Sequence, residues 1–176
     1  MIRALALSLV LLLSPALCLA AKGDTYRVAI TRVSDGDTVR GRVVGAQGNR
    51  EVKIRLYGID APETKGQHWE AQPWSRKSAD YLRSILPPGK VCTAKVLDVD
   101  RYGREVALLS LEGVGLVQDA ILNEGFAWVY EQYCTEEPLC GKLRRVEAAA
   151  KAARRGLWRD EDRVPPWEWR KAASAK

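Results

Sequence analysis

Histidine and closely spaced cysteines, the usual ligands of zinc, are scarce in this sequence. The chain of 176 residues has one histidine, His68, and four cysteines, with no Cys-x-x-Cys pair among them. Structural zinc sites usually draw on such pairs, so the sequence argues against one. The hydrophobic content of 47% is ordinary for a soluble protein, and the length is enough for one domain with a substantial core.

Long apolar runs are also lacking, apart from one at the start of the chain. Residues 4–13 are nearly all apolar, a short positive segment precedes them, and Pro15 ends the run. Ten to fourteen apolar residues are too few to span a bilayer, and Ala20 follows as a small residue at a cleavage site. We therefore predict that residues 1–20 are a secretory signal.

A lipid anchor is the alternative interpretation of this start. It would use Cys18, but Leu17 precedes that cysteine where a lipoprotein signal normally has a small residue. We expect a secreted or periplasmic protein, with residues 21–160 as its main domain and 161–176 as a tail that contains proline and tryptophan.

Three cysteines remain once the signal is removed. Cys134 and Cys140 are six positions apart, and a bridge between them would close a short loop in an exported, oxidised protein. Cys92 would then be left over, packed as a small apolar residue in a strand. Three free thiols are the alternative.

The formal net charge of +6 and the pI near 9.2 favour an anionic partner, such as nucleic acid. Much of the excess lies late in the chain. For most of those residues we expect a simpler role, which is to solvate the outer face of a helix; they are Lys142, Arg144, Arg145, Lys151, Arg154 and Arg155.

Apolar and polar residues alternate in five segments and recur at helical spacing in three. The strands are predicted at 26–31, 38–44, 51–59, 91–99 and 105–111. The helices are predicted at 75–86, with Ser75 as N-cap, at 116–124 and at 139–155. The tail at 164–169 is not expected to be helical, and its tryptophans are expected to dock on the body. This order predicts an α+β, mainly β fold: a five-stranded Greek-key OB barrel with three helices.

The end of the third strand concentrates groups suited to phosphate-ester chemistry. Arg55, Asp60 and Glu63 lie within nine positions, and Pro62 restricts the path between the two acids. The alternation places Arg55 and Tyr57 off the apolar face of the strand. Each residue alone is as easily a surface group, but a rigid strand end is a favourable place for an active site.

Two further carboxylates precede the second strand. Asp35 and Asp37 are two positions apart and would face the same way on an extended segment, an arrangement that suits a hard cation. A simple turn is the alternative. An EF-hand is excluded, because Arg40 stands where that loop requires glycine.

Three motifs occur in a fixed order: Asp35-Gly36-Asp37-Thr38-Val39, then residues 55–64 (RLYGIDAPET), then Asp100-Arg101-Tyr102-Gly103-Arg104. In this order they resemble the staphylococcal nuclease (thermonuclease) family, over roughly residues 26–158. The resemblance implies an enzyme that uses Ca²⁺ to hydrolyse DNA and RNA and leaves 3′-phosphate ends. We expect a monomer, and no stable protein partner is implied.

The resemblance also implies a role for each matching residue. Arg55, Glu63 and Arg104 stand at catalytic positions, and Arg101 and Tyr102 at substrate-binding ones. The calcium ligands are Asp37, Asp60 and the backbone carbonyl of Ala61, with Asp35 supporting the ion through water. A binding module that keeps the barrel without catalysis is the main alternative, and it would typically lack one or more of these residues. A structural envelope protein would leave their clustering unexplained.

The segment 66–74 departs from the family pattern in its aromatic content. Trp69 and Trp74 would be able to stack bases, as aromatic side chains do in proteins that bind single strands. Loop anchoring is the interpretation that we favour. For His68 we expect a surface position.

Overall fold

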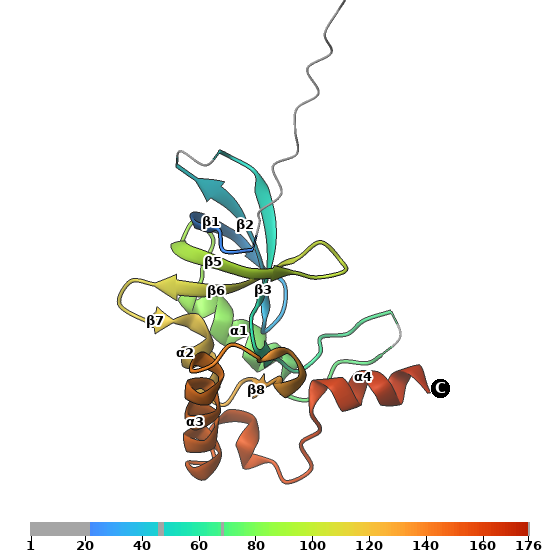
Figure 1. The fold of residues 1–176 in the computed structure, drawn as a ribbon. Coiled ribbons are helices and arrows are strands. Elements are labelled where there is room, and N and C mark those ends of the chain that lie inside the picture. Colours follow the sequence, from blue (N-terminus) through green and yellow to red (C-terminus); the bar gives the residue numbers. More distant parts are fainter. Residues whose placement is uncertain (1–21, 46–47, 68, 176) are drawn as a thin grey trace, which may run out of the picture.

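Five long strands close into the barrel in the upper half of Figure 1. The computed structural model describes residues 22–45, 48–67 and 69–175. The strands are β1 (Thr25–Val33), β2 (Thr38–Val44), β3 (Glu51–Leu56), β5 (Val91–Val99) and β6 (Glu105–Leu111). Their order is β3-β2-β1-β5-β6, and a parallel pairing of β3 with β6 closes the ring. The prediction of a five-stranded OB barrel is therefore confirmed.

Alternating apolar residues fill the barrel. In β3, Val52, Ile54 and Leu56 are buried while Glu51 and Lys53 are exposed. Because successive side chains of a strand point to opposite faces, one apolar face of each strand builds the core. The charged residues between them remain on the outside of the wall.

The third strand is shorter than predicted, because a turn follows Leu56. Gly58 has a φ of 72°, and a Cβ there would lie 2.8 Å from Cys134 Sγ, so both the conformation and the packing favour glycine. After the turn, β4 (Ile59–Asp60) pairs with β8 (Trp128–Val129) in a second small sheet. The chain thus leaves the barrel wall just before its acidic residues.

The prediction that Tyr57 lies off the apolar face of the strand is wrong, because Tyr57 belongs to the buried core. It is 5% exposed. Its hydroxyl accepts hydrogen bonds from the backbone N–H of Thr135 at 2.7 Å and of Glu136 at 2.9 Å. The strand alternation ends with the turn, so the period-two pattern does not apply to Tyr57.

Helices gather below the barrel in the view of Figure 1. The three predicted helices are present as α1 (Ser75–Ile85), α2 (Val117–Asn123) and α3 (Leu139–Ala152). The third ends three residues earlier than predicted, because Arg154 has a φ of 49° and the chain turns before Gly156. The remaining short elements are β7 (Gly115–Leu116) and two 3-10 helices, η1 (Glu131–Tyr133) and η2 (Gly156–Arg159).

Ser75 is not the N-cap of α1, contrary to prediction. Trp74 is the cap residue, with a φ of 70° and no side-chain hydrogen bond to the helix. Its indole Nε1 donates to Asp160 Oδ2 at 2.6 Å, and its ring packs against Phe126. These contacts come from distant parts of the chain, so the local cap pattern did not reveal them.

The tail contains a fourth helix, which corrects the prediction that it is not helical. Helix α4 spans Pro166–Ser174 and begins at a proline. Proline is favoured in the first turn of a helix, where its missing N–H would have no partner. As predicted, the tryptophans dock on the body: the ring of Trp167 stacks on Tyr130, and Trp169 Nε1 donates to the Glu70 carbonyl at 3.1 Å.

The structure contains a disulfide between Cys134 and Cys140, and Cys92 is a buried free thiol. Burial raises the Cys92 pKa to about 11. Within the described ranges, we find no helix with the length and apolar character needed to cross a membrane. The predicted signal at 1–20, with Cys18, and the single histidine, His68, lie outside the described residues.

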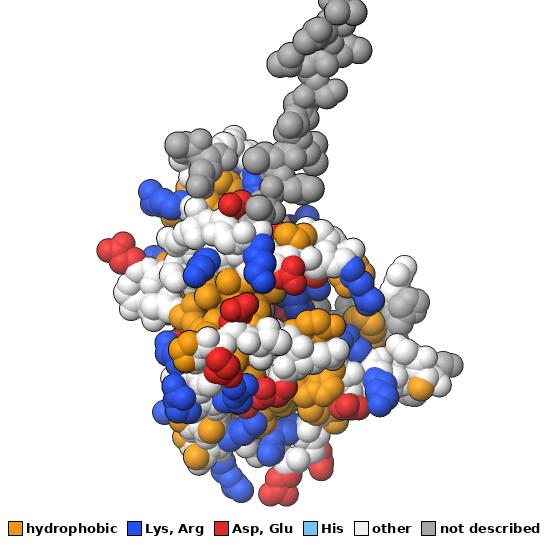
Figure 2. All heavy atoms as spheres, viewed as in Figure 1, with side chains coloured by type: hydrophobic (Ala, Val, Ile, Leu, Met, Phe, Trp, Pro, Cys, Tyr) orange, Lys and Arg blue, Asp and Glu red, His pale blue; other side chains and the backbone are white. Residues whose placement is uncertain are grey.

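Three of the six late basic residues, Lys142, Arg144 and Lys151, are paired with acids. Lys142 contacts Asp119, and Lys151 Nζ lies 2.8 Å from Glu147 Oε2. In Figure 2, lysine and arginine side chains are interspersed with acidic ones on the face shown. This fits solvation of the outer face of α3 better than a dedicated basic patch.

Candidate active site

Arg55 and Asp37 meet because β2 and β3 are neighbours. The register of these strands sets Thr38 opposite Arg55, so Asp37 stands at the end of the pair. The N–H of Leu56 donates to the Asp37 carbonyl at 2.8 Å, which fixes this corner. As a result, Arg55 Nη1 lies 3.1 Å from Asp37 Oδ1.

Asp60 joins the same guanidinium from the other side of the turn. It lies on β4 and is fully buried, with 0% exposure. Arg55 Nη2 lies 2.5 Å from Asp60 Oδ1. One partly buried arginine therefore bridges two buried carboxylates. Of the three residues first noted at the end of the third strand, Arg55 and Asp60 are in direct contact.

Asp37 is held rigidly by further hydrogen bonds. Its Oδ1 accepts from Thr38 Oγ1 at 2.9 Å, and its Oδ2 accepts from the N–H of Ala61 at 3.0 Å. Its own N–H donates to Asp35 Oδ1 at 3.0 Å. The motif that precedes β2 and the turn that follows β3 are thus joined through one carboxylate.

Glu63 is positioned by the loop that leads to α1. Its N–H donates to Gln72 Oε1 at 3.0 Å, and its carbonyl accepts from the N–H of Gln72 at 2.8 Å. The Glu63 side chain is 20% exposed. It reaches the same cluster as Asp60, because both contact a third residue, Arg170.

Arg170, on α4, is the site residue that the sequence did not reveal. Its Nη2 lies 2.8 Å from Asp60 Oδ2, its Nη1 lies 3.2 Å from Asp60 Oδ1, and Nη1 also donates to Glu63 Oε1. Asp60 and Arg170 are 110 positions apart, in a tail with no motif around the arginine. No local pattern would have identified it.

Arg104 and its neighbours are held within their own hairpin. Arg104 Nε lies 2.6 Å from Asp100 Oδ2, and the N–H groups of Tyr102 and Arg104 donate to Asp100 Oδ1. Arg101 Nη2 donates to the exposed Tyr102 hydroxyl at 2.6 Å. The contacts described for Arg104 thus lie outside the carboxylate cluster, and its catalytic role stays a prediction.

The carboxylates differ in acidity according to their surroundings. Burial, and next the charge of Asp37, raise the pKa of Asp35 to about 7. Burial also works against ionisation of Asp37, but the Arg55 charge and the hydrogen bonds around Asp37 outweigh it and lower its pKa. Burial raises the pKa of Asp60 and of Glu63, despite their pairing with Arg170. Four carboxyl groups therefore share two arginines, Arg55 and Arg170, and burial opposes the ionisation of these carboxyl groups.

Comparison with known proteins bears on this arrangement. Residues 53–160 match the model of the family described as staphylococcal nuclease homologue. An uncharacterized endonuclease of Escherichia coli is 37% identical over 156 residues, which cover 89% of each chain. A micrococcal nuclease of Shigella flexneri is 30% identical over 181 residues, covering 98% of this chain and 93% of the relative.

The chain belongs to the staphylococcal nuclease family. It is a nuclease, a hydrolase whose substrate is nucleic acid. The family match begins at Lys53 and ends at Asp160, so it includes Arg55, Asp60 and Arg104 but not Arg170. Asp35 and Asp37 precede it.

The donors in this nuclease suit a hard cation. Within the part of the chain that the structure describes, no group of three His, Cys, Asp or Glu side chains is gathered as a metal site. Asp37 and Asp60 nevertheless converge on one guanidinium, and Asp35 and Glu63 add charge that two arginines do not balance. Carboxylate oxygens are the ligands that calcium prefers. The residues therefore fit such an ion.

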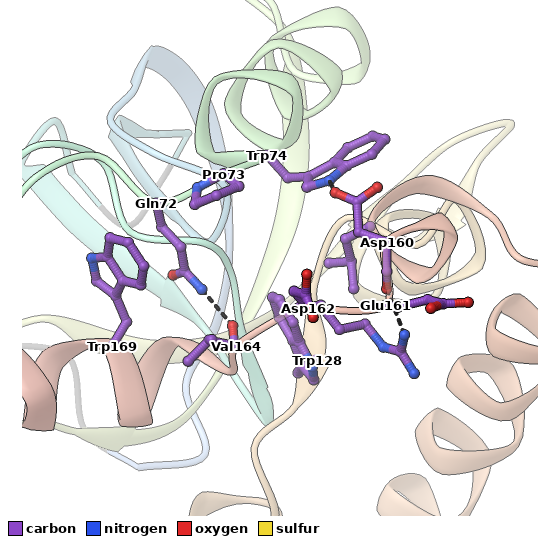
Figure 3. Close-up of a pocket in the computed structure, with 11 residues that line it drawn as sticks. Gln72, Pro73, Trp74, Trp128, Asp160, Glu161, Asp162, Val164 and Trp169 are labelled. Atoms are coloured by element: carbon purple, nitrogen blue, oxygen red, sulfur yellow. Dashed lines mark hydrogen bonds between the residues drawn. The ribbon is translucent and has the colours of Figure 1, made fainter.

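The two tryptophans of the 66–74 segment anchor loops in this nuclease. Trp69 Nε1 donates to the Thr64 carbonyl at 3.0 Å, and Trp74 is bound to Asp160 as described above. Figure 3 shows Trp74 and Gln72 beside a cavity of about 380 Å³ between this segment and the tail. These contacts fit the favoured interpretation, in which the indoles hold loops in place.

Proposed function

We propose that this nuclease is calcium-dependent and cleaves the P–O5′ bond of DNA and RNA, leaving 3′-phosphate ends. The observation that carries the proposal is the contact of Arg55 with both Asp37 and Asp60. It supports the proposal because a guanidinium, a group well suited to bind phosphate, lies beside two buried carboxylates that suit a hard cation, and Glu63 lies in the same cluster.

Asp37, Asp60 and the carbonyl of Ala61 would hold calcium, with Asp35 supporting the ion through water. Bound there, the ion supplies positive charge at the phosphodiester. The N–H of Ala61 already bonds to Asp37, so the backbone of Ala61 is fixed against that carboxylate. The side chain of Ala61 does not matter for this role, because the proposed calcium ligand is its main-chain carbonyl oxygen.

Arg55 binds the scissile phosphate and neutralises the charge that develops on its oxygens. Glu63 orients the attacking water and takes its proton, and burial, which raises the Glu63 pKa, favours this role. As the new P–O bond forms, the bond to O5′ breaks. Arg104 assists the departing oxygen, for which its guanidinium must leave Asp100. Arg101 and Tyr102, at the same hairpin, contact the substrate strand.

We also propose that the protein is exported and acts as a monomer. The Cys134–Cys140 disulfide supports export, since such bonds persist in oxidising compartments. A lipid anchor on Cys18 is the alternative location. A module that binds nucleic acid without cleaving it is the alternative function, and the presence of all three catalytic side chains argues against it.

The ends of the products test the reaction. Protein spanning residues 21–176 is incubated with calcium and a single-stranded oligonucleotide labelled at its 5′ end. The fragments should be extended by a polymerase only after phosphatase treatment, because a 3′-phosphate blocks extension. Fragments that are extended directly would contradict the proposed bond cleavage, and an intact but bound oligonucleotide would favour the binding module.

A further inference from the structure

Helix α4 brings a cation of the protein itself to the carboxylates proposed to bind calcium. The Arg170 guanidinium contacts both oxygens of Asp60 and one oxygen of Glu63. Asp60 is fully buried, and the Arg170 side chain is 27% exposed. The arginine therefore lies at the solvent side of the cluster, where a metal ion or a phosphate would enter.

Three contacts fix α4 in this position. The ring of Trp167 stacks on Tyr130 at 5.0 Å with an angle of 6° between the rings. Trp169 Nε1 donates to the Glu70 carbonyl at 3.1 Å. Just before the helix, the Val164 carbonyl accepts from Gln72 Nε2 at 2.5 Å, as Figure 3 shows.

Two of these anchors lead directly to the site. Gln72, which holds the tail at Val164, also accepts the N–H of Glu63 through its Oε1. Tyr130, on which Trp167 stacks, donates its own N–H to the carbonyl of Gly58 in the turn before Asp60. The residues on which α4 docks, Gln72 and Tyr130, therefore belong to the segments that position Glu63 and Asp60.

The contact with Arg170 competes with a metal ion for Asp60 more fully than Arg55 does, because Arg170 contacts both Asp60 oxygens and Arg55 contacts one. A cation that occupies both oxygens of Asp60 repels a second cation at short range. An ion pair with arginine also stabilises the ionised form of Glu63 and blocks water from that oxygen. Both effects are relieved only if Arg170 withdraws.

The attachment of α4 buries few of its own side chains. Among its residues only Pro166 is fully buried; Trp167 is partly buried against a small apolar cluster, and the helix is otherwise held by polar contacts to Gln72 and the carboxylates. Elements with few buried apolar contacts open at low free-energy cost. The barrel does not depend on them.

We propose that α4 is an autoinhibitory latch in which Arg170 competes with calcium for Asp60, so that metal binding and docking of the helix exclude one another. The inference rests on the proposed calcium dependence. If the latch is closed nine times in ten, the apparent calcium affinity is weakened about tenfold. A variant in which Arg170 no longer contacts Asp60 should therefore bind calcium about tenfold more tightly.

Calorimetric titration with Ca²⁺ alone tests the latch on protein spanning residues 21–176. Arg170→Gln should bind calcium about tenfold more tightly than the wild type. Trp167→Ala should also bind more tightly, since it loosens the helix and leaves Arg170 in the chain. Lys171→Gln is the matched control, because it removes one charge from an exposed neighbour on the same helix, and it should bind like the wild type.

Equal or weaker affinity in Arg170→Gln and Trp167→Ala overturns the latch. Weaker substrate binding in Arg170→Gln, with calcium affinity unchanged, would also overturn it, because Arg170 would then be a phosphate-binding residue. If neither the wild type nor the variants bind calcium, the calcium assignment fails and the latch fails with it. Equal calcium binding by all four proteins defeats the latch alone.

Discussion

Arg55 Nη2 lies 2.5 Å from Asp60 Oδ1, across the turn that ends β3. The same guanidinium reaches Asp37 through its other nitrogen. One side chain therefore serves two buried carboxylates before any metal is bound. It follows that Arg55 contributes to the stability of the metal-free fold as well as to the reaction.

Replacing Arg55 by alanine should lower the free energy of unfolding of the metal-free protein by about 3 kcal/mol or more. Asp60 keeps its contacts with Arg170, but Asp37 loses its ion-pair partner, and a buried charge left without its partner is strongly destabilising. Saturating calcium should recover part of the loss, because a ligand that binds only the folded state stabilises it. Urea denaturation with chelator and with calcium measures both effects.

Arg42→Ala is the control for that comparison. Its ion pair with Glu51 joins two exposed side chains, so we expect a loss of stability below about 1 kcal/mol. A similar loss of stability in both variants would show that the Arg55 contacts stabilise the fold no more than an exposed ion pair does.

Glu63→Gln should lower kcat at least about 100-fold and change KM little. Glutamine keeps the shape of the side chain but cannot take a proton from water, and a positioned general base contributes roughly 10²–10⁴-fold. Steady-state kinetics on single-stranded DNA measure the effect. Glu70→Gln, an exposed acid in the same loop, is the control and should act like the wild type. Full activity in Glu63→Gln would remove Glu63 from the reaction.

Asp35 should make the metal-free protein less stable as the pH rises from about 4 to 7. Burial holds its folded pKa at about 7, so over this range the folded state keeps a proton that the unfolded chain releases. Below about pH 4 both states are protonated and the penalty disappears. The full penalty is reached above pH 7.

Asp35→Asn tests that argument, because asparagine does not ionise and its carbonyl can still accept from the N–H of Asp37. The variant should be more stable than the wild type by more than about 1 kcal/mol at pH 8, with the difference vanishing toward pH 4. Denaturation curves in chelator at several pH values provide the measurement. A constant difference across the range would rule out titration of Asp35 as the cause.

Reduction of the Cys134–Cys140 disulfide should cost about 2 kcal/mol of stability, since it frees a short loop in the unfolded chain. The loop packs against Gly58 and the Tyr57 hydroxyl, so the turn before Asp60 loses support as well. Thermal unfolding with and without reductant measures the change. A double Cys134→Ser, Cys140→Ser variant should not respond to reductant, and an equal response would show that loss of this disulfide is not the cause.

The sequence was sufficient where the controlling interactions are local. The alternation in β2, β5 and β6 predicted their bounds, since a half-buried strand requires that pattern. The grouping of Asp37 with Arg55 could be inferred from the ordered motifs. Arg170 could not, because its position depends on how α4 packs against Tyr130 and Gln72.

Two errors have the same physical origin. The prediction that residues 164–169 are not helical overlooks that a proline is favoured at the first position of a helix, where Pro166 stands in α4. Tyr57 was assigned to the outer face because the strand was extended through a turn that Gly58 makes possible. In both cases one local signal had two interpretations, and the structure adopts the one that was not predicted.

The rate of single-stranded DNA hydrolysis at controlled free calcium tests the central claim most directly. Protein spanning residues 21–176 should degrade the DNA with calcium, stop in excess chelator, and recover when calcium is restored. Asp60→Asn should require a higher calcium concentration, because it removes one charged ligand. Undiminished hydrolysis in chelator, or an unchanged calcium requirement in Asp60→Asn, would contradict the assignment of this cluster as a calcium-dependent active site.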